Sequence, residues 1–318
     1  MEFQTKIPLR SYQHKIDYDS KIVSLGSCFA VNIAQKFKEF QFQVTSNPFG
    51  ILFHPQALEK ILDYAVSNYV FAERDVFCLD GVWSCFDAHS DLNQLEQSDC
   101  IDHLNAALGN LRFDLQQATH VVLTLGTAWG YYYKATQALV ANCHKVPQAQ
   151  FDKKIMSYQE VWAAYERISA LLLELNPQLH IIYTISPVRH IKDGFVENQR
   201  SKAILIAALH EFLEDKQAKQ WYFPSYEIIM DELRDYRFYA ADMLHPSPVA
   251  IQYIWNRWTQ NMMDEAVLPV MKKVSEVQSG LNHRPFNPTS EKHGMFLDNL
   301  AGKIDDLLER FPFMNFRP

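Results

Sequence analysis

The sequence predicts an α/β protein built around a mostly parallel sheet of five strands. Five short runs rich in β-branched and aromatic residues alternate with stretches that have helical periodicity. Strands that alternate with helices form βαβ units, in which neighbouring strands run parallel. The run Val121–Leu125 is almost entirely apolar, as expected for a strand that helices cover on both faces. With 318 residues, 48% of them hydrophobic, the chain can build a sizeable core.

The five runs and the helical stretches between them can be placed along the chain. The predicted strands are Ile22–Leu25, Phe42–Ser46, Val121–Leu125, Ile181–Ile185 and Trp221–Phe223. The predicted helices are Phe29–Glu39, Pro55–Tyr69, Ile101–Phe113, Tyr158–Leu175 and Asn198–Leu213. A further helix after Pro248 closes the domain, because apolar residues recur there at helical spacing at Ile251, Ile254, Trp255 and Trp258.

Two segments break this alternation. Asp75–Ser90 contains an Asp80-Gly81 pair between apolar residues, which is a signal for a β-hairpin. Tyr131–Gln148 is polar and aromatic, and we expect a loop or ribbon there. Both segments are predicted to lie over the carboxyl edge of the sheet, where open α/β sheets bind their ligands.

The chain divides into a main domain and a short extension. We predict one domain over residues 1–268, with no internal repeat or earlier boundary. The stretch Leu281–Ser290 contains two prolines and is predicted to be a linker. After it, apolar residues at helical spacing between Phe296 and Leu308 predict an amphipathic helix. Residues 269–318 are therefore expected to form a linker and a helix that packs on the domain.

Composition excludes several classes of partner. The net charge is −7 and no basic tract stands out, whereas phosphate binding needs clustered Lys and Arg, so we expect no nucleic-acid partner. Residues 1–6 lack the apolar stretch of a signal peptide. No run of about 18 apolar residues predicts a membrane span. We therefore expect a cytoplasmic protein without a membrane partner, and the sequence carries no signal for an oligomeric state.

The cysteines and histidines suggest neither disulfides nor a metal site. The five cysteines, Cys28, Cys78, Cys85, Cys100 and Cys143, are scattered and odd in number, which favours free thiols in a reducing compartment. The chain has no HxxxH or CxxC motif for a metal ion, and no Walker A or GxGxxG motif for a nucleotide. We therefore expect no metal and no cofactor.

The most informative stretch is the Gly26-Ser27-Cys28 turn, which follows the first strand and precedes the first helix. A side chain there lies at the carboxyl edge of the sheet and at a helix N-terminus, which favours a thiolate or an oxyanion. The sequence leaves open whether Ser27 Oγ or Cys28 Sγ is the nucleophile. Ser27 could instead cap the helix, and Cys28 could be a small packing residue.

A candidate base lies near the end of the domain. Asp242 precedes His245 by three residues, so its carboxylate can turn back to the imidazole Nδ1–H and leave Nε2 as a base. The alternative is a structural histidine at the start of the closing helix, where Pro246 and Pro248 also suit a helix start. A nucleophile, an oriented base and backbone donors at glycine turns are the parts of an acyl-transfer site.

These motifs resemble a known family. The order of the nucleophile and the Asp-x-x-His pair is similar to that of SGNH (GDSL-type) hydrolases. The closer resemblance is to the GSCFA-domain family, whose name matches Gly26–Ala30. The other matching segments are Asn47-Pro48-Phe49-Gly50, His89-Ser90, Asn142-Cys143-His144-Lys145, Ser186-Pro187-Val188-Arg189-His190, Asn198 with Ser201-Lys202, Tyr226-Glu227 and Asp242-Met243-Leu244-His245-Pro246. The resemblance covers roughly residues 22–258 and continues weakly at 283–287.

The resemblance implies a flavodoxin-like, doubly wound three-layer sandwich. It places Cys28 at the position of the SGNH nucleophile, with Ser27 at the aspartate before it. His245 and Asp242 take the positions of the base and its orienting carboxylate. It also implies that the backbone N–H groups of Cys28 and Gly50 stabilise the oxyanion.

One expected oxyanion donor is absent from the sequence. The asparagine that supplies the third donor in SGNH hydrolases would fall on Ala128, whose side chain cannot donate. Loss of one such donor typically costs on the order of 100–1000-fold in rate. Thr127 or Trp129 could substitute, as could Asn47 or Asn32.

The remaining candidates are substrate contacts on the edge loops, namely Asn47, His89, Trp129, His144, Arg189 and His190. Arg189 could bind an anionic group or form an ion pair. Trp129 could stack on a sugar ring or simply pack its loop against the sheet.

Taken together, these features predict an ester hydrolase or O-acyltransferase. Its substrate would be a small-molecule or carbohydrate acyl ester, attacked at a Cys/Ser-His-Asp site. The rival prediction is a non-catalytic small-molecule or glycan-binding module with a degenerate pocket. A thiol-dependent amidase or peptidase is a further enzymatic alternative.

Overall fold

The central sheet has the predicted five parallel strands. The structure is a computed structural model and describes residues 4–214 and 219–316. The strands are β1 (Lys21–Gly26), β2 (Gln43–Ser46), β5 (His120–Leu125), β9 (His180–Ile185) and β10 (Gln220–Tyr222). They lie in the order β10-β9-β5-β1-β2 with every neighbouring pair parallel. Numbered along the chain, this is the flavodoxin-like order 2-1-3-4-5, so the fold prediction is confirmed.

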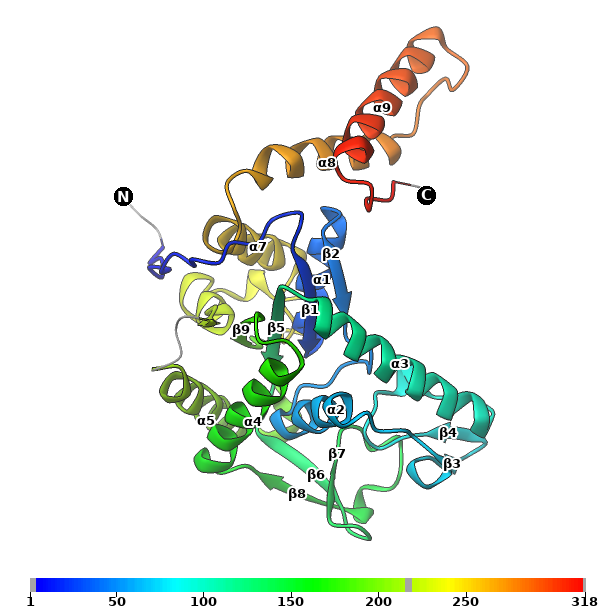
Figure 1. Cartoon of the computed structure of the whole chain (residues 1–318). Coiled ribbons are helices and arrows are strands. Elements are labelled where there is room, and N and C mark those ends of the chain that lie inside the picture. Colours follow the sequence, from blue (N-terminus) through cyan, green and yellow to red (C-terminus); the bar gives the residue numbers. More distant parts are fainter. Residues whose placement is uncertain (1–3, 215–218, 317–318) are drawn as a thin grey trace.

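Helices cover both faces of this sheet (Figure 1). On one face lie α2 (Pro55–Ser67), α3 (Gln97–Gln117), α4 (Tyr158–Leu175) and α5 (Phe195–Leu213). On the other face lie α1 (Cys28–Glu39) and α7 (Pro248–Met262). The predicted helices are therefore confirmed, although α1, α3 and α5 begin one, four and three residues before the predicted start.

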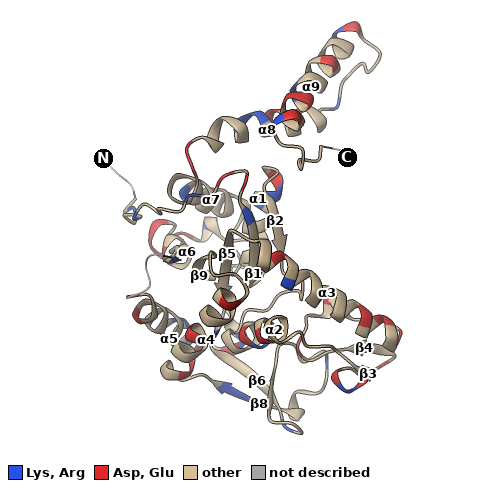
Figure 2. Ribbon diagram, viewed as in Figure 1, with Lys and Arg blue, Asp and Glu red and all other residues tan. Residues whose placement is uncertain are grey.

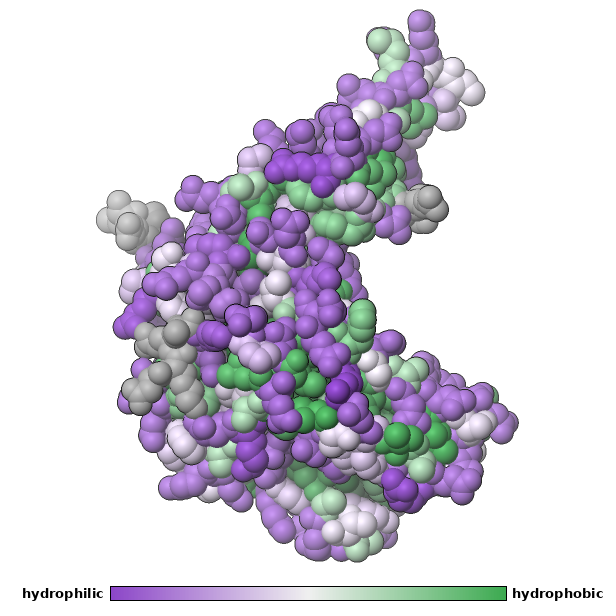
Figure 3. Space-filling view, viewed as in Figure 1, coloured by the Kyte–Doolittle hydropathy of each residue, from purple (hydrophilic) through white to green (hydrophobic). Residues whose placement is uncertain are grey.

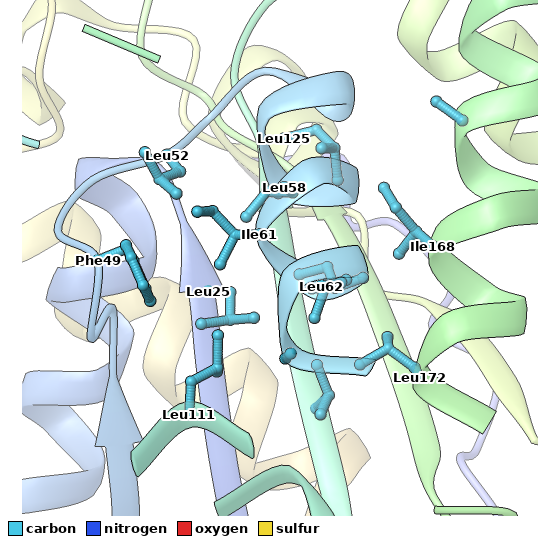
Figure 4. Close-up of a cluster of buried hydrophobic side chains, with 14 of the residues drawn as sticks. Leu25, Phe49, Leu52, Leu58, Ile61, Leu62, Leu111, Leu125, Ile168 and Leu172 are labelled. Atoms are coloured by element: carbon cyan, nitrogen blue, oxygen red, sulfur yellow. The ribbon is translucent and has the colours of Figure 1, made fainter. Parts of the chain in front are cut away.

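The two layers form because side chains of a strand alternate between the faces. In β1, Ile22 belongs to the core beneath α1 and α7, whereas Val23 and Leu25 belong to the core beneath α2–α5. Figure 4 shows Leu58 and Leu62 of α2 packed over Leu25, with Ile168 and Leu172 of α4 beside them. This double coverage explains the nearly continuous apolar strands.

The two interrupting segments form antiparallel ribbons. The predicted hairpin is present as β3 (Phe77–Leu79) and β4 (Val82–Ser84), with Asp80 and Gly81 both at positive φ. β6 (Trp129–Tyr133), β7 (Ala138–Val140) and β8 (Phe151–Ile155) form a second sheet in the order β7-β6-β8. β6 begins four residues after β5 ends, so this ribbon extends from the carboxyl edge of the central sheet.

The ribbon and the shorter helical segments complete the main body. β8 contains Lys153 and Lys154, and Figure 2 shows this strand in blue, with other Lys and Arg scattered over the helices. The remaining short segments are η1 (Glu73–Asp75), η2 (Ser90–Leu92), η3 (Gln148–Gln150), η4 (Ile191–Asp193), α6 (Ser225–Glu227), η5 (Ile228–Glu232) and η6 (Tyr236–Phe238). Within the described residues, no helix combines the length and the apolarity needed to cross a bilayer.

The C-terminal extension consists of two helices rather than a linker and one helix. α8 (Val267–Leu281) precedes the predicted linker, and α9 (Glu291–Arg310) follows it. The two helices project from the body as an arm (Figures 1 and 3). α8 buries Val270, Val274 and Val277 at helical spacing, so it carries its own apolar stripe.

Candidate active site

The chain turns sharply where β1 ends, beside the end of β5. Gly26 has φ +134°, and a Cβ on it would lie 2.2 Å from the carbonyl oxygen of Thr124. The backbone N–H of Ser27 donates to that same oxygen at 3.0 Å. Only glycine fits here, since both the φ and the space exclude a side chain. The turn therefore places Ser27 and Cys28 at the gap between β1 and β5, the topological switch point of the sheet.

Ser27 is the N-cap of α1. Its side chain is 1% exposed, and its Oγ accepts the backbone N–H of Phe29 at 3.2 Å. An N-cap hydroxyl satisfies one of the unpaired N–H groups of the first helical turn. The hydroxyl that could have been the nucleophile is thus buried and engaged in the fold.

Cys28 is the first residue of α1, with a partly exposed, free thiol. Burial raises the pKa of this thiol above its ordinary value, while the N–H of Phe29 and the positive charge of Lys202 lower it and the charge of Asp242 raises it. The dominant effect is burial, so the resting group is the thiol, and its use as a nucleophile requires a base.

His245 and Asp242 form the predicted pair. The imidazole Nδ1 lies 2.5 Å from Asp242 Oδ2, and the backbone N–H groups of His245 and Leu244 donate to Oδ1 at 3.0 and 2.9 Å. These three donors lower the pKa of Asp242 to about 2. The carboxylate therefore stays ionised and accepts the Nδ1–H, so Nε2 is the ring nitrogen that can exchange a proton with the nucleophile.

His245 and the nucleophile turn lie at the same edge without a direct bond. Both side chains of the Asp242–His245 pair are 46% exposed. Among the described residues, neither Ser27 nor Cys28 forms a hydrogen bond with His245. The charge of Asp242 nevertheless acts on the Cys28 thiol. Catalytic hydrogen bonds are often long in the unliganded state and shorten only when substrate binds.

The turn after β2 was predicted to supply the Gly50 N–H as an oxyanion donor, but the free donor in this turn belongs to Asn47. The Gly50 N–H donates to the Asn47 carbonyl at 2.8 Å, so it is already engaged. The Asn47 Oδ1 accepts the Gly26 N–H at 2.8 Å. Its Nδ2 is buried and has no partner among the described residues. Asn47 thus holds the nucleophile turn with one amide atom and offers a free N–H with the other.

His89 packs directly behind this turn. A Cβ on Gly50, which has φ +72°, would lie 2.2 Å from the His89 Cβ. The His89 N–H donates to the Phe49 carbonyl at 3.0 Å, and its Nδ1 lies 3.1 Å from Asp91 Oδ1.

Thr127 and Trp129 lie where β5 leads into the ribbon. The Thr127 hydroxyl is buried. It lies 2.9 Å from Ser201 Oγ and accepts the Trp129 N–H at 3.1 Å, so it is already hydrogen-bonded within the fold. The Trp129 indole donates to the Glu197 carbonyl at 3.3 Å, and Lys153 lies 4.9 Å above its ring. The Cys28 backbone N–H has no acceptor among the described residues except its own thiol.

His144 is engaged in holding a loop together. It is 8% exposed, and its Nε2 donates to the carbonyls of Cys85 at 2.7 Å and Ala88 at 3.0 Å. These bonds tie the loop after β7 to the segment that leads into His89. A substrate could use this ring nitrogen only by displacing both bonds.

Arg189 and His190 follow β9. The His190 N–H donates to Asn198 Oδ1 at 2.9 Å, and its ring lies 5.1 Å from the Phe53 ring. Burial lowers the pKa of His190 to about 4, so the imidazole is neutral at pH 7. Its Nε2 is buried and has no partner in the described part of the chain, and it lies 3.2 Å from where a Cβ on Gly126 would lie.

Lys202 is a buried lysine that was not among the predicted site residues. It is fully buried on α5, and its Nζ donates to the carbonyls of Gly126 and Ser186, both at 2.6 Å. It thus bridges the residues that follow β5 and β9. Burial lowers its pKa to about 7. The sequence did contain a signal that Lys202 is buried. Asn198, Ser201 and Lys202 occupy i, i+3 and i+4 positions, which lie on the inward-facing side of this helix.

The site contains no obvious metal centre. Within the described residues, no three side chains of His, Cys, Asp or Glu lie together as metal ligands would. The thiol, the imidazole and the unpartnered N–H groups suit covalent chemistry on a carbonyl compound.

Comparison with known protein families agrees with the motifs. The model of the GSCFA family matches residues 21–258. A second model, described as the C-terminal domain of GSCFA domain proteins, matches residues 274–318 and so covers most of the arm. No curated protein is similar enough in sequence to match. Since the first match spans most of the chain, this protein belongs to the GSCFA family.

Proposed function

We propose that this protein is an SGNH-like ester hydrolase or O-acyltransferase that uses Cys28 as its nucleophile. The observation that carries the proposal is the Asp242–His245 pair, with 2.5 Å between Oδ2 and Nδ1, at the same sheet edge as the free thiol of Cys28. The flavodoxin-like strand order supports it, because it is the order that the resemblance to SGNH hydrolases implies.

In the first half-reaction, His245 Nε2 takes the proton from Cys28 Sγ as the sulfur attacks the ester carbonyl. The carbonyl oxygen becomes an oxyanion, which the Cys28 N–H and the unpartnered Asn47 Nδ2 stabilise. The carbon–oxygen bond to the alcohol then breaks, and the proton on His245 passes to the departing alkoxide. The products are the free alcohol and a thioester on Cys28.

In the second half-reaction, His245 takes a proton from the acceptor, which is water in a hydrolase and a hydroxyl in a transferase. The acceptor oxygen attacks the thioester, the carbon–sulfur bond breaks, and His245 returns the proton to the sulfur. Asp242 stabilises the imidazolium in both steps. A small-molecule or carbohydrate ester fits this chemistry, and a reducing compartment such as the cytoplasm keeps the thiol available.

A non-catalytic binding module is the second candidate. It is favoured by the raised pKa of Cys28 and by the engagement of the Gly50 N–H and the Thr127 hydroxyl within the fold. The two candidates differ in one observable, since only the enzyme forms a covalent acyl intermediate.

The test is to mix the protein with p-nitrophenyl acetate and follow both p-nitrophenolate release and the intact mass. We expect a gain of one acetyl group on Cys28, absent from Cys28→Ala. Cys78→Ala is the matched control, because Cys78 is an exposed cysteine far along the chain on β3. If Cys28→Ala and His245→Ala hydrolyse the ester as fast as the wild type, the proposed enzyme is excluded.

A further inference from the structure

Two cationic side chains at this edge of the sheet lack a carboxylate partner. Lys202 donates only to backbone carbonyls. Arg189, on the loop after β9, is partly buried, and its Nη2 contacts the thioether sulfur of Met230 at 3.1 Å. Within the described residues, no Asp or Glu oxygen lies within 4.0 Å of either group. A thioether is a weak acceptor for a guanidinium. The other side-chain hydrogen bond of Arg189 is with the Tyr239 hydroxyl, which is also uncharged.

The carboxylates of the surrounding segments form hydrogen bonds or ion pairs with residues other than Arg189 and Lys202. Both Glu227 oxygens accept the Tyr222 hydroxyl, at 2.7 and 2.8 Å. Asp231 pairs with Arg234 at 2.8 Å. Asp242 is held by His245. Among the residues that the structure describes, none of these carboxylates forms an ion pair with Arg189.

Two buried polar atoms without hydrogen-bond partners lie in the same segments. Asn198 is 2% exposed, and its Oδ1 accepts the His190 N–H, but its Nδ2 has no partner within residues 4–214 and 219–316. The His190 Nε2 is buried and unpartnered as well. A buried polar group without a partner is unfavourable, and a bound ligand can supply the missing hydrogen bond.

These groups are close to the nucleophile. The charge of Arg189 acts on Lys202, and the charge of Lys202 acts in turn on both Cys28 and His190. Lys202 also connects the segments that carry Gly126 and Arg189, because it bonds to Gly126 and to Ser186.

We propose that Arg189 and the Asn198 amide bind an anionic group of the substrate, a carboxylate or a phosphate, beside Cys28. This inference rests on the proposed acyl-transfer function and names its substrate class. A guanidinium binds either anion through two parallel hydrogen bonds, which fixes orientation as well as affinity. The anion also balances the buried charge of Lys202, so its binding is stronger than at an exposed arginine.

The direct test is the binding of inorganic phosphate and of succinate by calorimetry at low ionic strength. We expect Arg189→Met to raise the Kd at least about tenfold, the lower end for a hydrogen bond to a charged group. Arg189→Lys should recover part of the affinity. Arg200→Met is the matched control, because Arg200 is an exposed arginine of α5 paired with Glu197 at 3.4 Å. It should bind both anions as the wild type does.

A second variant keeps the inference testable if Arg189→Met does not fold. Asn198→Asp keeps the Oδ1 that accepts the His190 N–H but places a carboxylate at the site. It should weaken both anions at least as much as Arg189→Met does. Equal Kd values for wild type, Arg189→Met and Asn198→Asp would overturn the inference, as would the absence of phosphate and succinate binding to the wild type.

Kinetics then separate this inference from the proposed function. We expect Arg189→Met to raise KM about tenfold for p-nitrophenyl hydrogen succinate, and to leave KM for the uncharged p-nitrophenyl butyrate unchanged. The binding measurements are repeated in Cys28→Ala, which cannot turn over. If the anions bind there but no ester is cleaved by the wild type, the proposed reaction fails while the anion site stands. If both esters are cleaved and respond equally to Arg189→Met, the anion site fails while the reaction stands.

Discussion

The carboxylate of Asp242 holds His245 at two points, through Oδ2 to the imidazole Nδ1 and through Oδ1 to the backbone N–H. Met243, between them in the turn, adopts φ +60°. The ring is thus fixed in both tautomer and direction, although the pair is half-exposed. A histidine that served only to start α7 would not need the second contact, because Ser247 already caps that helix.

Asp242→Asn is the variant that tests this arrangement. The amide oxygen can still accept the backbone N–H groups of Leu244 and His245, so we expect the loop to keep its shape. The loss of the negative charge should lower kcat for acyl transfer on the order of 100–10,000-fold, the range of general acid–base catalysis. Stopped-flow ester hydrolysis and circular dichroism check the two parts. A variant with wild-type kcat would show that Asp242 only shapes the loop.

Ser27→Ala should affect stability rather than chemistry. Loss of the N-cap should lower the free energy of unfolding by about 1 kcal/mol, while acetylation of Cys28 persists. Ser247→Ala, at the N-cap of α7, is the matched control and should cost a similar amount. Urea unfolding and the acyl-enzyme mass give the readouts. If Ser27→Ala abolishes acylation at unchanged stability, Ser27 is the nucleophile.

Lys202 makes the stability depend on pH in a specific direction. Its pKa is about 7 in the folded protein, against an ordinary value of 10.5 in the unfolded chain. Between these two pH values the unfolded chain binds more protons, so Lys202 makes the free energy of unfolding rise with pH. The penalty for its buried charge is full below pH 7 and is relieved as the pH rises toward 10.5.

Lys202→Met removes this pH dependence. We compare the free energy of unfolding of the variant with that of the wild type. The variant should gain most over the wild type at pH 6.5, and this gain should decrease steadily to pH 9.5. Urea titrations of both proteins at these pH values measure the difference. Lys303→Met, at a lysine of α9 that pairs with Glu276 on the surface, should show a difference that is constant with pH. A difference that is also constant with pH for Lys202→Met would contradict the lowered pKa of Lys202.

Gly26→Ala tests the close approach of β1 to β5. Gly81 serves as the control, since it also has positive φ but nothing lies within 4 Å of a Cβ built there. Gly81→Ala should therefore cost only the backbone strain, about 1–2 kcal/mol. Gly26→Ala adds the clash with the Thr124 carbonyl and should cost a further 1–3 kcal/mol or so. Equal losses in urea unfolding would show that β1 and β5 separate easily.

Much of the fold follows from local patterns. The five strands and the helices between them were predictable because apolar runs and helical periodicity report directly on burial. β8 was missed because its Lys153 and Lys154 are adjacent and interrupt the alternation of a strand. α8 was missed although its valines recur at helical spacing, because it comes after the helix that closes the domain and contains Pro269 in its first turn.

The site was predictable where residues adjacent in sequence act together. The Asp242–His245 contact spans three residues, so spacing alone indicates it. The engagement of the Gly50 N–H and the bonds of His144 depend on how turns close, which spacing does not report. The bridge that Lys202 makes joins residues from three elements, and only the packing of α5 against the sheet brings them together.

The thiol and the imidazole enter the chain more than two hundred residues apart, at Cys28 and His245. During synthesis Cys28 emerges first, and His245 follows only after the residues of β5, β9 and β10 have been added. An N-terminal fragment that ends before residue 245 lacks the imidazole of His245. Acyl-transfer reactivity would therefore appear only once the main domain is nearly complete. Labelling of Cys28 by an ester would then time the completion of folding.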